Sequence, residues 1–178
     1  MYRLERSLPV STQHLSHKIF MQFIVKHPKQ CTRNELDGFI WLLSKLSLLP
    51  SSYSIKKISS VYLLGFCKDD AKIIWISAIK KPKSTRIQEL RHSTATELPD
   101  VIWEYGYVYV SPSYRWSWIS KKLYALLVKK IGIPLYATVK ADNLAMKKLL
   151  KQFGFTQQGQ SFKSAIDGKS LIIYTKNR

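Results

Sequence analysis

The sequence predicts a single α/β domain in which a mixed, mainly antiparallel central sheet is flanked by helices and preceded by a helical N-terminal region. Three observations predict it: two β-rich runs around a short turn, a strand that enters a helix through a Pro-marked loop, and a second strand–helix unit followed by closing strands. The 178 residues suit one domain that is large enough to bury a core. We expect residues 1–60 to be the helical part and residues 61–178 to be the motif-bearing core.

Apolar residues in the N-terminal region recur at helical spacing. Ser11 or Thr12 would cap a first helix, which Pro28 ends. Thr32 and Glu35 have the spacing of a capping box and would open a second helix. The expected apolar faces comprise Leu15, Ile19, Phe20, Phe23 and Ile24 in the first helix, and Phe39, Leu42, Leu43 and Leu46 in the second.

A hairpin is expected next. Residues 61–67 and 72–79 are β-rich runs on either side of a short turn, and they predict the central pair of an antiparallel sheet. The basic segment over residues 80–86 is expected to be a loop that faces either solvent or a polyanion. A short helix over residues 85–96 then leads to the next strand.

The C-terminal half alternates strands and helices. The expected elements, in order, are a strand over residues 102–110, a helix over 117–130, a strand over 135–140, a helix over 144–153, and a last strand over 171–175 paired with residues 155–162. The short loop between the first strand and its helix would gather unpaired backbone N–H groups at one point, which is typical of a phosphate site.

Two motifs in this half resemble those of the GNAT acetyltransferase superfamily. The family pattern is V-x-P-x-Y-R-G-x-G at the end of a strand, followed later by N-x-x-A-x-x-L-Y-x-x-x-G-F. The matching residues are Val110, Pro112, Tyr114 and Arg115 in the first motif, and Asn143, Leu149, Gly154 and Phe155 in the second. The resemblance covers roughly residues 61–178. It implies a GNAT-like fold with an acyl-CoA-binding core, and an N-acetyltransferase that uses acetyl-CoA as co-substrate.

The resemblance also implies a cofactor site around the first motif. The implied cofactor-binding residues are Val108, Val110, Arg115, Trp116, Ser117, Trp118, Ile119, Ser120, Lys121 and Asn143. The chain departs from the family's loop pattern R-x-x-G-x-G/A, which has small residues so that the backbone can approach phosphate closely, because Trp118 and Ser120 stand at the two glycine positions. Trp118 must either turn outward, stack on adenine or a base, or pack into the protein with the loop on another path.

For catalysis, the resemblance points to Glu104 and Val110. Glu104 lies in an apolar strand and would accept a proton through water, although a carboxylate paired with one of the many cations is the alternative. The main-chain N–H of Val110 would hold the thioester carbonyl, and Gly106 would permit a bulge that opens the strand. The general acid is open, since Leu150 stands where many family members carry Tyr. The possible substitutes are Tyr136, Tyr114 and water.

Composition limits the partners. The 29 Lys+Arg against 11 Asp+Glu leave a net charge of +18, which favours a nucleic acid or other polyanion over solubility alone. Two distant cysteines, Cys31 and Cys67, favour a reducing compartment, and we expect a cytoplasmic protein without a signal peptide or membrane span. No metal site is expected, because the spacing of His14, His17, His27 and Cys31 matches no zinc pattern.

The sequence therefore leads to one main hypothesis and a rival. The first is acetyl transfer from acetyl-CoA to a primary amine, with an acceptor such as aminoacyl-tRNA, a ribosomal protein or a small polyanionic metabolite. The rival is a non-catalytic GNAT-fold protein that binds nucleic acid through its basic, Trp-bearing surface. A purely structural partner-binding domain has little support in the sequence.

Overall fold

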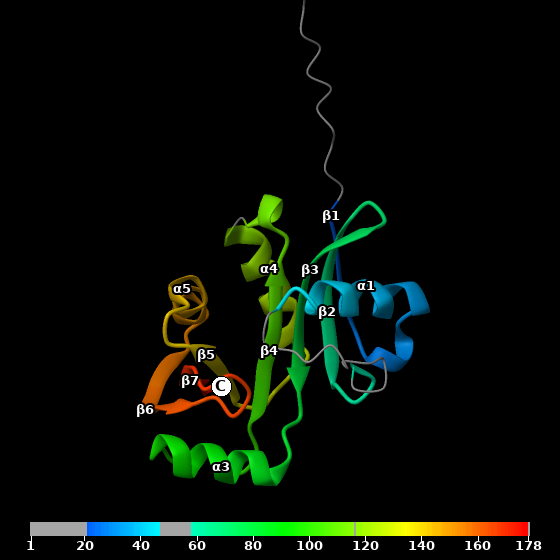
Figure 1. Cartoon of the computed structure of the whole chain (residues 1–178). Coiled ribbons are helices and arrows are strands. Elements are labelled where there is room, and N and C mark those ends of the chain that lie inside the picture. Colours follow the sequence, from blue (N-terminus) through cyan, green and yellow to red (C-terminus); the bar gives the residue numbers. More distant parts are fainter. Residues whose placement is uncertain (1–20, 47–57, 116, 178) are drawn as a thin grey trace, which may run out of the picture.

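The computed structural model describes residues 21–46, 58–115 and 117–177 (Figure 1). Its centre is a seven-stranded sheet with the strand order β1-β2-β3-β4-β5-β7-β6. The strands are β1 (Met21–Lys26), β2 (Leu63–Asp69), β3 (Lys72–Lys80), β4 (Trp103–Val110), β5 (Leu135–Lys140), β6 (Thr156–Lys163) and β7 (Ser170–Lys176). All neighbours are antiparallel except β4 and β5, which are parallel. The predicted mixed, mainly antiparallel sheet is confirmed.

Helices cover the sheet on both faces. The helices within the described ranges are α1 (Arg33–Leu43), α3 (Ser84–Thr94), α4 (Ser117–Val128) and α5 (Leu144–Gln152). Residues of α1 join a core cluster on one face of the sheet, and residues of α4 and α5 join the main cluster on the other. The side chains that the helices bury there are Leu36, Phe39, Leu42 and Leu43 from α1, Ile119, Leu123, Tyr124 and Leu127 from α4, and Leu150 from α5. Among these helices, none is long and apolar enough to cross a membrane.

The N-terminal region differs from the prediction. Where a helix was expected to bury Phe23 and Ile24 on one face, residues 21–26 form β1, paired antiparallel with β2. The side chain of Phe23 packs against the main core cluster on the α4 face, whereas that of Ile24 packs against the cluster on the α1 face. Neighbouring apolar residues buried on opposite faces suit a strand, not an amphipathic helix. The expected cap and the first part of the expected helix, residues 11–20, lie outside the described residues.

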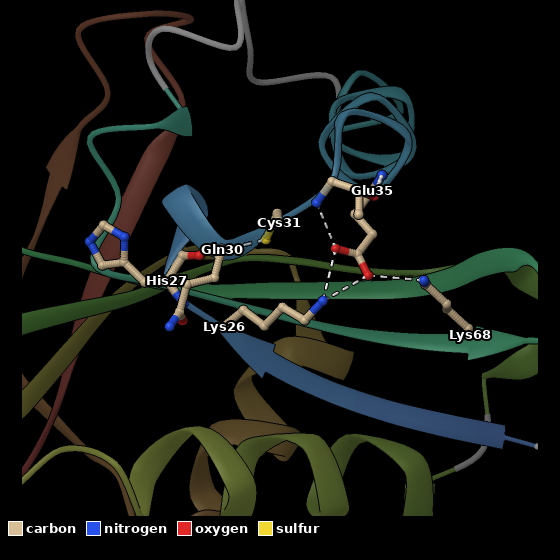
Figure 2. A network of polar contacts seen from close by, with 7 residues as sticks. Lys26, His27, Gln30, Cys31, Glu35 and Lys68 are labelled. Carbon is tan, nitrogen blue, oxygen red and sulfur yellow. Dashed lines mark hydrogen bonds and ion pairs between the residues drawn. The ribbon is translucent and has the colours of Figure 1, made fainter.

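The predicted capping box of α1 is confirmed and has further partners (Figure 2). The Glu35 backbone N–H donates to Thr32 Oγ1 at 3.2 Å, and the Thr32 N–H donates to Glu35 Oε2 at 3.0 Å. Lys26 Nζ of β1 and Lys68 Nζ of β2 also reach this carboxylate, at 3.1 and 3.0 Å. The Glu35 side chain is only 7% exposed. It therefore joins the start of α1 to two neighbouring strands.

Burial opposes the charge of Glu35, but the hydrogen bonds from the Thr32 backbone, Lys68 and Lys26 outweigh it, so its pKa lies below the usual 4.5. Because the folded-state pKa is lowered, the carboxylate stabilises the fold above pH 4.5. That stabilisation is lost progressively as the pH falls through the folded-state pKa.

We expect Glu35→Gln to lower the free energy of unfolding at pH 7 by about 2 kcal/mol, because two part-buried ammonium groups lose their charged acceptor. The difference from wild type should shrink as the pH falls below 4.5. Urea unfolding across this pH range measures both. The control is Asp37→Asn on the same helix, which breaks an exposed pair with Arg33 and should cost about 0.5 kcal/mol or less. Equal losses for both variants would contradict the prediction.

Candidate functional site

The parallel pairing of β4 with β5 is short. The register joins Trp103 to Leu135 and Glu104 to Tyr136, at the first two residues of each strand. On its other edge β5 pairs with β7 along its whole length, from Leu135 to Lys140. The second half of β4 thus has a gap on its β5 side, which Figure 1 shows as the divergence of the two strands.

A bulge in β4 lies within the stretch that borders the gap. Ile76 of β3 is opposite Tyr109, and Ala78 is opposite Gly106, so β4 contains one residue more than β3 between these pairs. Tyr107 has a φ of 55°, an unfavourable conformation for a bulky residue. The bulge therefore lies beside Gly106, as the sequence predicted, but Tyr107 adopts the left-handed backbone.

Backbone donors of β4 face the gap beyond the bulge. The Ser111 N–H donates to the Ile74 carbonyl oxygen of β3 at 2.9 Å. Because successive N–H groups of a strand point to opposite sides, the N–H of Val110 is directed away from β3. It is thus directed toward the gap.

A pocket of about 670 Å³ opens beside the gap. Its walls come from the end of β3, from β4, from α3, from the end of β5 with the start of α5, and from the end of β6 with the segment that joins it to β7. Of the predicted site residues, Glu104, Val108 and Asn143 line this pocket. Asn143 also caps α5, since its Oδ1 accepts from the Met146 N–H at 3.0 Å.

Two walls of the pocket, α3 and β6, meet at Gly159. This glycine has a φ of 58°, and a Cβ atom there would overlap the Thr94 carbonyl oxygen and the Thr96 hydroxyl. Thr94 is the last residue of α3 and is fully buried. Only glycine permits both this backbone conformation and this close approach.

Glu104 lies between a cation and a buried hydroxyl. Lys80 Nζ is 2.5 Å from Glu104 Oε1, and Tyr136 Oη donates to Glu104 Oε2 at 3.3 Å. The side chains of Lys80 and Glu104 are 21% and 20% exposed. Burial and the Glu104 charge raise the pKa of Tyr136, so its hydroxyl stays protonated and can donate. Glu104 thus lies in the pocket lining, as a base would, and it is also paired with a cation, as the alternative from the sequence has it.

The candidate general acids lie in different surroundings. Leu150 is fully buried in the core, and Tyr114 donates its hydroxyl to Asp69 Oδ2 at 2.7 Å. Tyr136 is the candidate that contacts Glu104. A further tyrosine, Tyr124 of α4, has a buried hydroxyl without a hydrogen-bond partner among the described residues, and burial raises its pKa to about 12.

The predicted phosphate-binding residues lie at the start of α4, outside the pocket lining. Trp118 turns outward: it is 47% exposed, and its ring centroid is 6.1 Å from that of Phe23 on β1. Ile119 and Ser120 are buried, whereas Arg115 and Lys121 are exposed. Ser117 is the first residue of the helix. Trp116 lies outside the described residues.

Several residues of the site were not predicted from the sequence. Lys80 was assigned to a basic loop, but it is the last residue of β3 and lies opposite Glu104. Arg86 and Glu89 of α3 line the pocket and form an ion pair at 3.2 Å. Strand register brings Lys80 to Glu104, and a single sequence carries no signal that fixes this register.

The fold is similar to that of solved acetyltransferases. A GNAT-family acetyltransferase from Streptococcus agalactiae has a TM-score of 0.66 at 12% identity, with 90% of this chain and 98% of that chain covered. The ribosomal-protein-S18-alanine N-acetyltransferase from Escherichia coli has a TM-score of 0.58 at 16% identity, over 86% and 92% of the two chains. yncA from Salmonella typhimurium, solved with its cofactor acetyl-CoA, has a TM-score of 0.61 at 13% identity, over 88% and 93%. Comparison of the sequence with protein-family models and with curated proteins finds no match.

We expect Tyr136→Phe to lower the free energy of unfolding by about 1 kcal/mol, because a buried hydrogen bond to a carboxylate is lost without a change of shape. The matched control is Tyr174→Phe, which removes a 3.4 Å bond from a buried hydroxyl to the neutral amide of Gln157. Thermal unfolding of both variants measures the difference. A Tyr136 variant as stable as wild type would show that the hydroxyl contributes nothing to holding Glu104.

Proposed function

We propose that this chain, which has the fold of the GNAT acetyltransferases, transfers an acetyl group from acetyl-CoA to a primary amine. The observation that carries the proposal is the gap between β4 and β5, which begins after Glu104, contains the Tyr107 bulge on its β4 side and lies beside a pocket lined by Glu104. Acetyl transfer needs a donor for the developing oxyanion, a group that takes the proton of the ammonium, and a site for the anionic carrier. The chain offers residues for each.

The start of α4 is the proposed site for the pyrophosphate of acetyl-CoA. The first turn of a helix presents backbone N–H groups that have no partner within the helix, which suits an anion. The first turn of α4 contains no acidic residue that would repel one. Arg115 and Lys121 are exposed beside it. Their positive charges would attract a bound phosphate. The outward position of Trp118 supports the proposal, since its side chain packs on Phe23.

The proposed chemistry uses the gap and the carboxylate. Acetyl-CoA supplies the acetyl group as a thioester. The N–H of Val110, and that of Val108 in the pocket lining, would donate to the carbonyl oxygen as negative charge develops there. Glu104 would accept the proton of the acceptor ammonium directly or through water, while the Tyr136 hydroxyl holds the second carboxylate oxygen in place.

The acceptor that we propose is an amine on, or bound near, a nucleic acid, such as an aminoacyl-tRNA or a ribosomal protein. The net charge of +18 supports a polyanionic partner, and one structural neighbour is an N-acetyltransferase of a ribosomal protein. The charges of the pocket lining support a polyanionic acceptor less strongly than the net charge does. Three of the cations in its lining, Lys80, Arg86 and Lys140, each form an ion pair with an acidic residue.

A non-catalytic nucleic-acid-binding protein is the second candidate, and one surface favours it. Trp118 lies against Phe23, and Lys122 Nζ is 4.6 Å from the centroid of the Phe23 ring. Lys121 is exposed on the same helix, and Lys129 is exposed directly after its end. Aromatic side chains among cations are typical of surfaces that stack bases and neutralise phosphates.

Calorimetric titration of the nucleic-acid-free protein with acetyl-CoA tests the main proposal. We expect micromolar binding that Arg115→Ala weakens about tenfold, because a charge-assisted contact to phosphate is lost. Lys129→Ala, at the other end of α4, is the control and should bind as wild type does. Absence of binding by the wild-type protein would contradict the proposal and favour the second candidate.

Titration with a single-stranded RNA tests the second candidate. Trp118→Ala should then lower the affinity by about 1–3 kcal/mol, which is the contribution of one stacked base. Trp41→Ala is a closely matched control, because Trp41 is 53% exposed and lies under a lysine, with Lys45 Nζ 5.0 Å from its ring centroid. Equal effects of the two substitutions would rule out a specific role for the surface around Trp118.

A further inference from the structure

We propose that Lys80 is a self-acetylation site, at which the protein transfers an acetyl group from acetyl-CoA to its own Lys80 Nζ. This inference rests on the proposed function. It begins from an ammonium group that already lies beside the carboxylate to which we assign proton transfer.

The surroundings of Lys80 Nζ go beyond those of an ordinary ion pair between neighbouring strands. Lys80 and Glu104 are opposite each other in the register, which accounts for their 2.5 Å contact. The bulge adds the ring of Tyr107, whose centroid is 4.4 Å from Lys80 Nζ. Gly106 lies beside both groups, since a Cβ atom there would be 3.4 Å from both Lys80 Nζ and Glu104 Oε1. A carboxylate, an aromatic ring and a bare backbone together surround the ammonium group.

The position of this group is that of an acceptor. Lys80 and Glu104 line the same pocket as Val108, where β4 separates from β5. The Lys80 side chain is 21% exposed, so it is mostly buried but still accessible from the pocket. Lys26 and Lys68 provide the contrast: they also pair with a carboxylate, that of Glu35, but they lie on β1 and β2 away from the gap.

The reaction balances without a further reactant. Glu104 takes one proton from the Lys80 ammonium, and the neutral amine attacks the thioester carbonyl carbon. The N–C bond forms and the C–S bond breaks. The sulfur leaves as the thiolate of CoA and takes up the second proton that the nitrogen loses. The products are N-acetyl-lysine and CoA, with one proton released from Glu104 to water.

Self-acetylation would also change the pocket. The neutral amide of acetylated Lys80 no longer forms an ion pair, so Glu104 becomes available to the ammonium of an external acceptor. Until it is acetylated, Lys80 thus holds Glu104 in an ion pair and takes the place of an external amine.

The test is peptide mass spectrometry of the purified protein after incubation with acetyl-CoA. We expect acetylation of Lys80 to exceed that of Lys81, Lys26 and Lys68, although Lys81 is the more exposed and would react first without catalysis. Glu104→Gln should slow acetylation of Lys80 by about 10²-fold or more, and Lys81→Arg should leave it unchanged. Circular dichroism shows whether the Glu104→Gln variant folds, and an unchanged rate per chain on dilution shows that the transfer occurs within one chain.

Calorimetry with acetyl-CoA on the same samples separates this inference from the proposed function. Binding of acetyl-CoA with Lys80 unmodified, or with Lys80 modified no faster than Lys81, overturns the inference and leaves the proposed function in place. Absence of binding overturns both. Acetylation of Lys80 in a folded Glu104→Gln variant at the wild-type rate overturns the part assigned to Glu104.

Discussion

The parallel ladder between β4 and β5 joins Trp103 to Leu135 and Glu104 to Tyr136, and then it stops. The bulge at Tyr107 follows three residues later, in the part of β4 that no longer pairs with β5. β5 is meanwhile held by β7 over its whole length, so it cannot follow β4. A backbone edge is thereby left open inside the sheet, next to a pocket, without an interruption of either core. The open edge has an energetic cost, since a bulky residue with positive φ costs about 1–2 kcal/mol.

Two carboxylates of the chain, Glu35 and Glu104, both form ion pairs with lysine but lie in different surroundings. Glu35 accepts hydrogen bonds from two lysines and a backbone N–H, and it fastens a helix to two strands. Glu104 contacts one lysine and one tyrosine and lies at the wall of a pocket. The role of a carboxylate therefore cannot be inferred from its ion pair alone. The space beside the pair distinguishes a structural carboxylate from a candidate base.

The sequence predicted the elements from residue 61 onward because each is a local pattern. The hairpin of β2 and β3, the strand–turn–helix from β4 to α4, and α5 with β6 and β7 all lie close to their expected bounds. The prediction was wrong at β1, because apolar residues buried on both faces of an edge strand also fit a helical spacing. The partners of Glu104 could not be predicted from the sequence, for a different reason. Lys80 and Tyr136 are 24 and 32 residues away from it, and they meet it only through the strand register.

Gly159 has a consequence for the range of molecules that the pocket can admit. It lets β6 approach the end of α3 so closely that any side chain there would push these two walls apart. The close approach of these two walls therefore depends on a residue outside the pocket lining. Selectivity for larger or smaller guests can change at this contact while every residue in the pocket stays the same. The fold thus separates the control of pocket size from the residues proposed for chemistry.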